Sequence, residues 1–183
     1  MTSRAVFLDR DGVLNRPLVR DGKPYPPADA ASVELYPGLR DQLQRLKDLG
    51  FRLIVVTNQP DVARGTTSKQ TVDDINRLIA SELPSIDKIL VCFHDNADNC
   101  ACRKPRPGML LEGAAAFDVD LARSYMVGDR RGDMEAGIAA GSRTIFVDRS
   151  YNEPKPTTYD HRVTSTQEAL NIIIESEIGH EEN

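Results

Sequence analysis

Short apolar segments alternate with longer amphipathic segments along this chain. Residues 52–57 centre on the mostly β-branched run Leu-Ile-Val-Val, and other apolar runs occupy residues 5–8, 88–92, 124–127 and 143–147. Uninterrupted apolar runs of this length are typical of strands that are buried on both faces. Between them, apolar side chains recur every three or four positions, which is the spacing of a helix with one buried face.

The helical segments have recognisable ends. Pro37 lies at a first helical position, Gly50 follows the last one, and Ser68 is placed to cap the next helix. A short sixth strand is expected near Val163, and the expected helices cover residues 37–49, 68–79, 107–117, 133–140 and 165–174. Repeated strand–helix alternation predicts an α/β fold, a Rossmann-like three-layer sandwich with a central parallel sheet.

Two segments interrupt this alternation. Residues 15–33 are rich in proline, glycine and charge, which predicts a long loop or flap, and residues 92–102 carry all three cysteines. A chain of 183 residues has the length of about one domain. We therefore expect a single domain over residues 1–183, with a minimal cap made of the flap (about 15–33) and the cysteine-bearing loop (about 92–102).

Charge and composition narrow the function classes. Lys and Arg number 23 against 28 Asp and Glu, and the resulting net charge of −5 argues against a general nucleic-acid or membrane-surface binder. The first nine residues lack the apolar core of a signal peptide, and no apolar run approaches the ~18 residues of a membrane span. We expect a cytoplasmic protein whose thiols stay reduced. No long apolar seam stands out, so a monomer is expected.

Carboxylates follow two of the predicted strands. Asp9 and Asp11 follow the first, and alternate residues of an extended chain point the same way, so both are able to face one centre. Such a pair suits a divalent cation, or a nucleophile with an acid–base partner, but it is equally compatible with a polar loop. Asp129 follows the fourth strand, where it is able to join Asp9 on the same metal. Asp133 suits either this site or the N-terminus of the next helix.

Uncharged donors and cations complete this sheet edge. Thr57, Asn58 and Gln59 follow the second strand, where they are able to bind an anion or simply cap a turn. Arg103 and Lys104 precede a predicted helix and are able to neutralise a phosphate. Each residue alone is as compatible with an ordinary surface role. Their joint placement favours one shared site, because sites in parallel sheets form at the carboxyl ends of the strands.

The cysteine-bearing loop supplies four candidate metal ligands. Cys92, His94, Cys100 and Cys102 offer three thiols and an imidazole, and each pair has one intervening residue, so each is able to chelate across a tight turn. Four protein ligands leave no open position, which predicts a structural Zn²⁺. Free buried cysteines are the alternative, but the intervening Asp and Asn residues are too polar for a buried segment.

The motifs, in their order along the chain, resemble those of a known family. They read Asp-Arg-Asp-Gly-Val-Leu-Asn from residue 9, Thr-Asn-Gln from 57, Arg-Lys-Pro-x-Pro-Gly-Met from 103 and Gly-Asp-x-x-x-Asp from 128. Together they resemble the four motifs of the haloacid dehalogenase superfamily of phosphatases. The Cys-x-His…Cys-x-Cys insertion is similar to the zinc-loop branch of that superfamily, which holds heptose bisphosphate phosphatases and histidinol-phosphate phosphatases.

The resemblance implies a role for each motif residue. Asp9 would be the nucleophile and Asp11 the general acid–base, while Thr57 would hold the transferring phosphoryl group. Lys104 would stabilise the phospho-aspartate. Mg²⁺ would be bound by Asp9, the carbonyl of Asp11 and Asp129. The residues expected to contact the substrate are Asn58, Gln59, Arg64, Arg103 and Arg130.

The resemblance also implies a reaction, the two-step hydrolysis of a sugar phosphate monoester. Residues 57–65 are more similar to the heptose enzymes, which implies cleavage of the 7-phosphate of D-glycero-D-manno-heptose 1,7-bisphosphate in nucleotide-activated heptose biosynthesis (a lipopolysaccharide or S-layer precursor). Histidinol phosphate is the alternative substrate for the same chemistry. A non-catalytic zinc-loop protein that binds phosphorylated ligands is a more distant alternative, which the filled catalytic positions disfavour.

Overall fold

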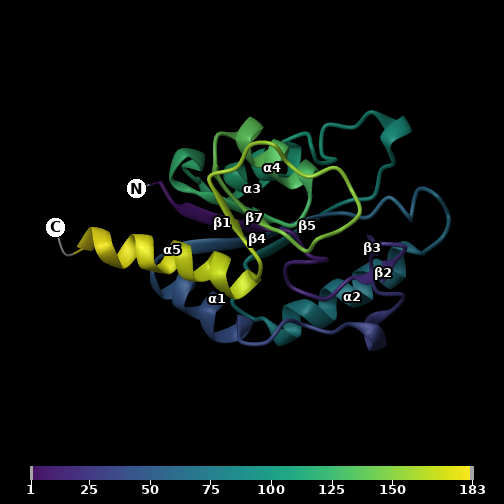
Figure 1. Ribbon diagram of the computed structural model, residues 1–183, viewed down its shortest axis with the longest axis horizontal. Helices are drawn as coiled ribbons and strands as arrows, with labels where there is room; N and C mark the ends of the chain where they lie inside the picture. The colour runs from purple at the N-terminus through teal and green to yellow at the C-terminus, as the bar shows by residue number, and fades with distance from the viewer. Residues whose placement is uncertain (1, 182–183) are drawn as a thin grey trace.

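The computed structural model describes residues 2–181, with the backbone alone for residues 179–181, and its centre is a parallel sheet (Figure 1). The six strands lie in the order β5-β4-β1-β6-β7-β8, and every neighbouring pair is parallel. The five predicted strands and the short sixth one are all present, which confirms the α/β prediction. The strands are β1 (Arg4–Leu8), β4 (Phe51–Asn58), β5 (Lys88–Cys92), β6 (Tyr125–Gly128), β7 (Arg143–Val147) and β8 (His161–Val163).

Helices cover both faces of the sheet. Alternate residues of a strand point to opposite faces, so Val6 and Leu8 of β1 pack on one side, and Ala5 and Phe7 on the other. The first side is covered by α1 (Leu39–Asp48), α2 (Lys69–Glu82) and α5 (Thr166–Glu181), and the second by α3 (Gly108–Phe117) and α4 (Arg131–Ala140). Figure 1 shows the two groups below and above the sheet, which completes the expected three-layer sandwich.

Helix starts differ from the expected ones by one or two residues. The Oγ of Ser68 accepts the N–H of Thr71 at 3.0 Å, so Ser68 caps α2 as predicted and the helix begins at the next residue, Lys69. In contrast, α4 begins at Arg131 rather than at Asp133. The reason is that the Asp133 carboxylate accepts the N–H of Arg130 at 3.0 Å, and so caps the helix from inside its first turn.

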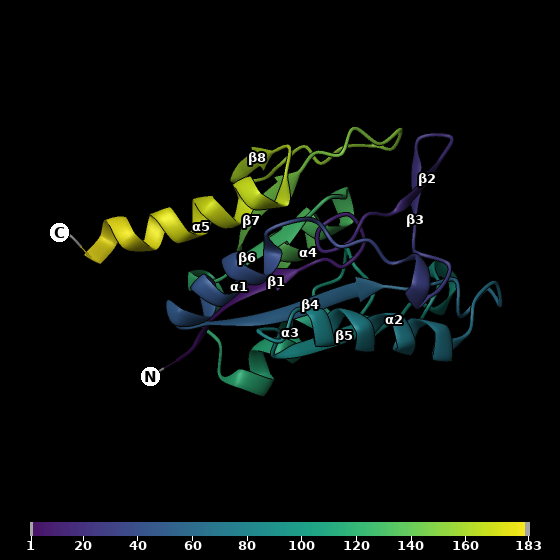
Figure 2. The ribbon, with the colours of Figure 1, turned by 90° about the horizontal axis from the view of Figure 1, so that it is seen from below.

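The flap predicted for residues 15–33 contains an ordered hairpin that its composition did not predict. The strands β2 (Leu18–Arg20) and β3 (Lys23–Tyr25) pair in antiparallel fashion. The hairpin turns at Asp21 and Gly22, whose φ angles of 51° and 74° suit a two-residue primed turn. Asp-Gly between two short extended segments is itself a hairpin signal, so the sequence held this information. Figure 2 places the hairpin at the end of the molecule away from the termini.

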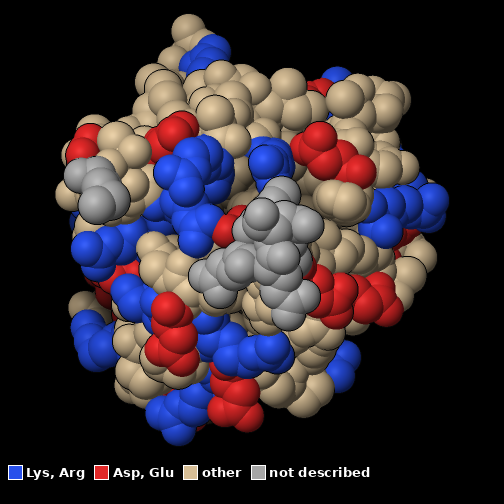
Figure 3. Space-filling model, turned by 90° about the vertical axis from the view of Figure 1, so that its left-hand side faces the viewer, with Lys and Arg blue, Asp and Glu red and all other residues tan. Residues whose placement is uncertain are grey.

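The end of the molecule that carries both termini has a mixed charge pattern. On this face Lys and Arg side chains lie among Asp and Glu side chains and do not gather in one basic area (Figure 3). In the part of the chain that the structure describes, no helix combines the length and the apolar character needed to cross a bilayer. The coloured part of the face in Figure 3 shows no surface of a single sign of the kind that binds a polyanion.

Candidate active site

The carboxyl ends of β1, β4 and β6 bring three motif segments together. Leu8 of β1 is in register with Val55 of β4 and Val127 of β6, so the residues that follow these strands share one edge. The N–H of Asp9 donates to the carbonyl of Val127 at 3.0 Å, which continues the strand pairing one residue beyond β1. Asp9, only 8% exposed, is thereby fixed at the centre of this edge.

Lys104 is a buried cation at this edge. Its Nζ donates to Asp9 Oδ1 at 2.8 Å and to the Val56 carbonyl at 2.7 Å, and it pairs with Asp133 Oδ1 at 2.7 Å. Asn58 holds the backbone of this lysine, because its Nδ2 donates to the Lys104 carbonyl at 2.9 Å and its Oδ1 accepts the Lys104 N–H at 3.1 Å. Burial lowers the pKa of Lys104, but the charges of Asp133 and Asp9 raise it by more. The net pKa lies above its usual value, so the ammonium stays protonated.

Three buried carboxylates cluster at this edge, and two of them, Asp9 and Asp133, pair with the ammonium. Oxygens of Asp9, Asp129 and Asp133 lie within 4.8 Å of one another. Burial and the charge of Asp133 raise the pKa of Asp9 to about 6, despite the nearby ammonium of Lys104. Burial and the charge of Asp9 also raise the pKa of Asp129. Three carboxylates and one ammonium leave a surplus of negative charge, which a divalent cation would neutralise.

The cluster has the donor set of a divalent-cation site. Asp129 is 2% exposed, and neither of its carboxylate oxygens has a hydrogen-bond partner within the described residues, although the Tyr151 hydroxyl lies close by. Buried carboxylate oxygens are costly unless a donor or a cation takes them. Two glycines allow the close approach: a Cβ on Gly12 (φ 93°) would lie 1.7 Å from Asp129 Oδ2, and one on Gly128 would lie 2.2 Å from Asp133 Cβ. These residues fit Mg²⁺, which prefers oxygen ligands.

Asp133 was absent from the ligand set predicted from the sequence, which comprised Asp9, the Asp11 carbonyl and Asp129. The structure groups the Asp133 carboxylate with those of Asp9 and Asp129 and pairs it with Lys104. The Gly-Asp-x-x-x-Asp motif contained this residue, and its position at a helix start left both interpretations open. Both apply, since Asp133 caps α4 and also contacts the buried lysine.

The side chain of Asp11 lies outside this carboxylate cluster and is held by three donors. Arg10 donates to Asp11 Oδ1 at 3.2 Å and to Oδ2 at 2.8 Å, while Asn15 Nδ2 donates to Oδ1 at 3.0 Å and Gln59 Nε2 to Oδ2 at 2.8 Å. Arg10 is fully buried and also donates to Asn76 Oδ1 of α2 at 2.9 Å. Nothing near Arg10 in the chain predicted its burial, because its partner Asn76 lies on a distant helix.

Gln59 connects two of the predicted catalytic residues. Its Nε2 donates to Thr57 Oγ1 at 2.9 Å as well as to Asp11 Oδ2. Thr57 and Gln59 are each 1% exposed as whole residues, yet both contribute atoms to the wall of the cavity at this edge. The carboxyl end of β4 and the residue that follows it therefore fix the relative positions of the hydroxyl and the acid–base candidate.

The four predicted zinc ligands converge on one point. The Sγ atoms of Cys92, Cys100 and Cys102 and the Nδ1 of His94 form one group, with separations from 3.2 Å (Cys102 to Cys92) to 3.7 Å (Cys92 to Cys100). Sulfur ligands of a tetrahedral zinc, about 2.3 Å from the metal, stand about 3.8 Å apart. Burial raises the pKa of Cys92 to about 12 and also raises that of Cys102, whereas at Cys100 the effect of burial is outweighed by the N–H of Arg103 and the neighbouring thiols, which lower its pKa to about 7. A metal ion would favour the thiolate form at all three. The set fits zinc.

A cavity of about 730 Å³ opens over the carboxylate cluster. It lies between the flap and the cysteine-bearing loop, residues 92–102, which we call the zinc loop from here on. The predicted substrate contacts Arg64, Arg103 and Arg130 all line it. Arg130 is engaged by the protein itself, because its Nε and Nη2 donate to the two carboxylate oxygens of Glu153 at 2.9 and 2.7 Å. No local signal in the sequence singled out Glu153.

Two further arginines of the cavity, Arg64 and Arg103, contact the zinc loop. Arg64 donates to both oxygens of Asp95 at 2.8 and 2.6 Å, and this hydrogen bonding lowers the pKa of Asp95 to about 2. Arg103 donates to Asn96 Oδ1 at 2.7 Å and to the His94 carbonyl at 3.3 Å. The zinc loop is therefore joined to the cavity wall on two sides.

Comparisons with known proteins agree with the motifs. A D-glycero-beta-D-manno-heptose-1,7-bisphosphate 7-phosphatase from Escherichia coli (strain K12) is 36% identical over 157 residues, which cover 80% of this chain and 79% of the relative. A protein of the same name from Helicobacter pylori (strain J99) is 34% identical over 146 residues, covering 76% of this chain and 79% of the relative. The crystal structure of D,D-heptose 1,7-bisphosphate phosphatase from B. bronchiseptica, complexed with magnesium and phosphate, superposes with a TM-score of 0.80 at 28% identity and covers 94% of this chain and 99% of that chain.

The family follows from a further match. A sequence profile described as haloacid dehalogenase-like hydrolase matches residues 25–141, which is more than half of the chain. The motif segments that carry the resemblance meet at one edge of the sheet, where Lys104 pairs with Asp9. The chain belongs to the haloacid dehalogenase-like hydrolase family.

Proposed function

We propose that this hydrolase is a Mg²⁺-dependent phosphatase that removes the 7-phosphate of D-glycero-D-manno-heptose 1,7-bisphosphate, in the supply of nucleotide-activated heptose. One observation carries the proposal: the Lys104 ammonium lies between Asp9 and Asp133, at 2.8 and 2.7 Å, beside the unpaired oxygens of Asp129. A nucleophile, a cation for phosphoryl charge and a divalent-cation site therefore meet at one point. The name that both relatives carry supports the heptose substrate.

Asp9 supplies the nucleophile in this proposal. Lys104 takes its Oδ1, so Oδ2 is the oxygen that attacks phosphorus in line, and the bond from phosphorus to the sugar oxygen breaks as the aspartyl-phosphate forms. Lys104 and the Thr57 hydroxyl stabilise the charge on the equatorial phosphoryl oxygens. Mg²⁺, held by Asp9, the Asp11 carbonyl and Asp129, would supply the charge neutralisation that lets two anions approach.

Asp11 is the general acid–base. It protonates the departing sugar oxygen in the first step, then takes a proton from the water that attacks the aspartyl-phosphate, which releases inorganic phosphate and restores Asp9. Its side chain is 17% exposed and lines the cavity, so it reaches the substrate while its donors fix its orientation. Acid–base assistance of this kind typically contributes ~10²–10⁴-fold to the rate.

The remainder of the substrate would occupy the cavity lined by Arg64, Arg103 and Arg130. Guanidinium groups suit phosphate and hydroxyl recognition, because they present several donors in one plane. Asn58 and Gln59 also line this cavity, so contacts with substrate are compatible with their hydrogen bonds to Lys104 and Asp11.

A structural Zn²⁺ is part of the proposal. The four ligands Cys92, His94, Cys100 and Cys102 belong to a loop with few buried apolar side chains, so a metal would supply the order that a hydrophobic core does not. Arg103 and Lys104 follow the loop directly. A metal that holds the loop in place would therefore also position Arg103, a proposed substrate contact, and the buried Lys104. About one zinc per chain is expected from metal analysis of protein purified without chelators.

Phosphate release tests the function directly. With Mg²⁺, the enzyme is assayed side by side on the two anomers of D-glycero-D-manno-heptose 1,7-bisphosphate and on histidinol phosphate. We expect the heptose bisphosphate to have the highest kcat/KM. Higher kcat/KM on histidinol phosphate would replace the substrate but keep the chemistry.

Two variants test the chemistry itself. Asp9→Asn should abolish phosphate release, whereas Asp73→Asn, the same change at a partly exposed carboxylate on α2, should leave it unchanged. Substantial turnover by Asp9→Asn would contradict the nucleophile assignment. Tight ligand binding without turnover in the unmodified enzyme would favour the non-catalytic alternative.

The assembly state and compartment stay predictions from the sequence. We propose a monomer that acts in the cytoplasm on a small phosphorylated sugar, without nucleic-acid or membrane partners. The reduced thiols that zinc requires are consistent with a reducing compartment. Sedimentation equilibrium at micromolar concentration should give the mass of one chain of 20.3 kDa, and a dimer mass would contradict this expectation.

A further inference from the structure

The carboxylate of Glu153 occupies the donor edge of an arginine that faces the active-site cavity. Both its oxygens accept hydrogen bonds from Arg130, at 2.9 Å from Nε and 2.7 Å from Nη2. This is the two-bond geometry with which a guanidinium also binds a phosphate. A phosphate can therefore use this edge of Arg130 only if it displaces the carboxylate.

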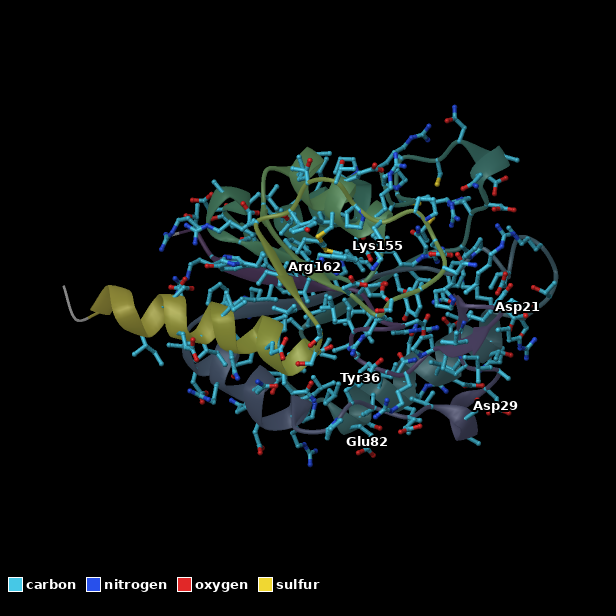
Figure 4. All side chains as sticks on the ribbon, viewed as in Figure 1. Asp21, Asp29, Tyr36, Glu82, Lys155 and Arg162 are labelled. Carbon is cyan, nitrogen blue, oxygen red and sulfur yellow. The ribbon has the colours of Figure 1, made fainter. Side chains whose placement is uncertain are left out.

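Glu153 is held in place by the segment that carries it. The neighbouring Asn152 donates its N–H to the carbonyl of Gly22 in the flap turn at 2.8 Å. The start of the segment is anchored at Asp148, a 7% exposed residue, which accepts the N–H of Ser150 at 2.8 Å. Asp148 is also contacted by two side chains labelled in Figure 4, Lys155 at 2.8 Å and Arg162 at 2.5 Å.

The other arginines of the cavity differ from Arg130 in this respect. Arg103 donates to neutral oxygens, those of Asn96 and the His94 backbone, so its charge remains available to an anion. Arg64 gives its two short hydrogen bonds to Asp95, outside the cavity wall, and only a longer one of 3.4 Å to Asp61 in the wall, whereas both side-chain hydrogen bonds of Arg130 go to Glu153, which lines the cavity. An anionic group that reaches Arg130 therefore meets the Glu153 carboxylate directly.

We propose that Glu153 is a specificity-determining residue, which competes with the second anionic group of the substrate for Arg130 and so limits the preference for a bisphosphate over a monophosphate. The inference rests on the proposed phosphatase function and adds to it a residue that no motif contains. Competition weakens bisphosphate binding in two ways, because the ion pair must open and the carboxylate repels the incoming phosphate. The scissile phosphate at Asp9 is bound by other residues.

The test compares two substrates that differ only in the remote phosphate. The ratio of kcat/KM for heptose 1,7-bisphosphate to kcat/KM for heptose 7-phosphate is measured for the unmodified enzyme and for Glu153→Gln. We expect this ratio to rise about fivefold in Glu153→Gln, mainly through a lower KM for the bisphosphate. A rise of this size corresponds to the free energy of one partly exposed ion pair. The gain should shrink as salt is raised, because screening weakens both effects.

A matched control and a double variant localise the effect. Glu34→Gln removes the carboxylate that pairs with Arg16 at 2.7 Å, a pair outside the cavity wall, and it should leave the ratio unchanged. In an Arg130→Gln background, Glu153→Gln should raise the ratio by clearly less than fivefold, because only the direct repulsion between the carboxylate and the phosphate remains to be removed.

The possible results separate the inference from the function. A ratio that falls, or stays constant, in Glu153→Gln overturns the inference while the phosphatase function stands. The same is true if the fivefold rise persists without Arg130. Failure of the unmodified enzyme to hydrolyse either heptose phosphate refutes the proposed substrate instead.

Discussion

The proposed nucleophile should destabilise the metal-free protein. Asp9 is 8% exposed and shares its site with the carboxylates of Asp129 and Asp133, so its negative charge is unfavourable in the fold even beside Lys104. The substitution Asp9→Asn removes that charge and keeps the shape of the side chain. We therefore expect Asp9→Asn to abolish turnover and at the same time to stabilise the protein in the absence of Mg²⁺.

The size of this effect follows from the pKa of Asp9, which burial and Asp133 raise from 3.8 to about 6. A tenfold change in an equilibrium corresponds to about 1.4 kcal/mol, so the ionised carboxylate is about 3 kcal/mol less favourable in the fold than in the unfolded chain. The folded state binds the proton more tightly, so this cost is complete above pH 7 and disappears as pH falls from 7 towards 4. Asp9→Asn should gain about 3 kcal/mol at pH 8 and about half of that at pH 5.

Urea unfolding followed by circular dichroism measures this difference. Buffers are freed of Mg²⁺ by ion exchange and contain no soluble chelator, so that the zinc loop keeps its metal. Added Mg²⁺ should narrow the gap, because the cation stabilises the unmodified protein more than the variant. Asp73→Asn, on the surface of α2, should change stability by less than about 0.5 kcal/mol at either pH. The reasoning is refuted if Asp9→Asn is no more stable at pH 8, or if its advantage does not decline by pH 5.

Three further predictions concern the residues around this centre. Lys104→Met should destabilise the metal-free protein by about 3–5 kcal/mol in thermal unfolding, because it leaves buried carboxylates without their cation, and a smaller loss would mean that water screens the cluster. Cys100→Ser and Cys102→Ser should each lower the zinc content by mass spectrometry and increase hydrogen exchange in α3, and full zinc content would contradict the ligand set. Hydrogen bonds from Lys155 and other donors outweigh the effect of burial and lower the pKa of Asp148 to about 2. The ionised carboxylate therefore stabilises the fold above pH 4, and this stabilisation is lost as pH falls towards 2. In urea unfolding, Asp148→Asn should lower the free energy of unfolding by about 1 kcal/mol at pH 7 and leave it unchanged near pH 2.

The sheet and its carboxylate edge could be predicted because their signals are local. The apolar run in β4 is long enough to be a buried strand, and the polar residues at its end, Thr57 to Gln59, mark where it leaves the sheet. Parallel strands end at the same edge of the sheet, so the acids that follow β1 and β6 can be predicted to lie close together without knowing any distant contact. The convergence of the three cysteines and His94 was predictable for the same reason, since all four lie within one loop.

Residues whose roles depend on distant partners could not be predicted. Arg10 is fully buried only because Asn76, 66 positions away, accepts one of its hydrogen bonds while Asp11 accepts two others. Glu153 meets Arg130 across 23 positions, through a segment without a periodic pattern. In both cases the local sequence reads as a polar loop, and only the tertiary packing decides which charge is buried.

The distribution of charge explains how an acidic protein can bind a doubly anionic substrate. At the centre, three carboxylates cluster and one ammonium pairs with two of them, which favours a divalent cation and makes that region less repulsive to phosphate once the cation is bound. At the rim, Arg64 and Arg130 are paired with carboxylates of the chain, while Arg103 contacts neutral oxygens. Affinity for the remote phosphate is therefore set less by the number of arginines than by how firmly their carboxylate partners hold them. A net charge of −5 is compatible with this binding, because each phosphate responds to a few nearby groups within a Debye length of about 8–10 Å.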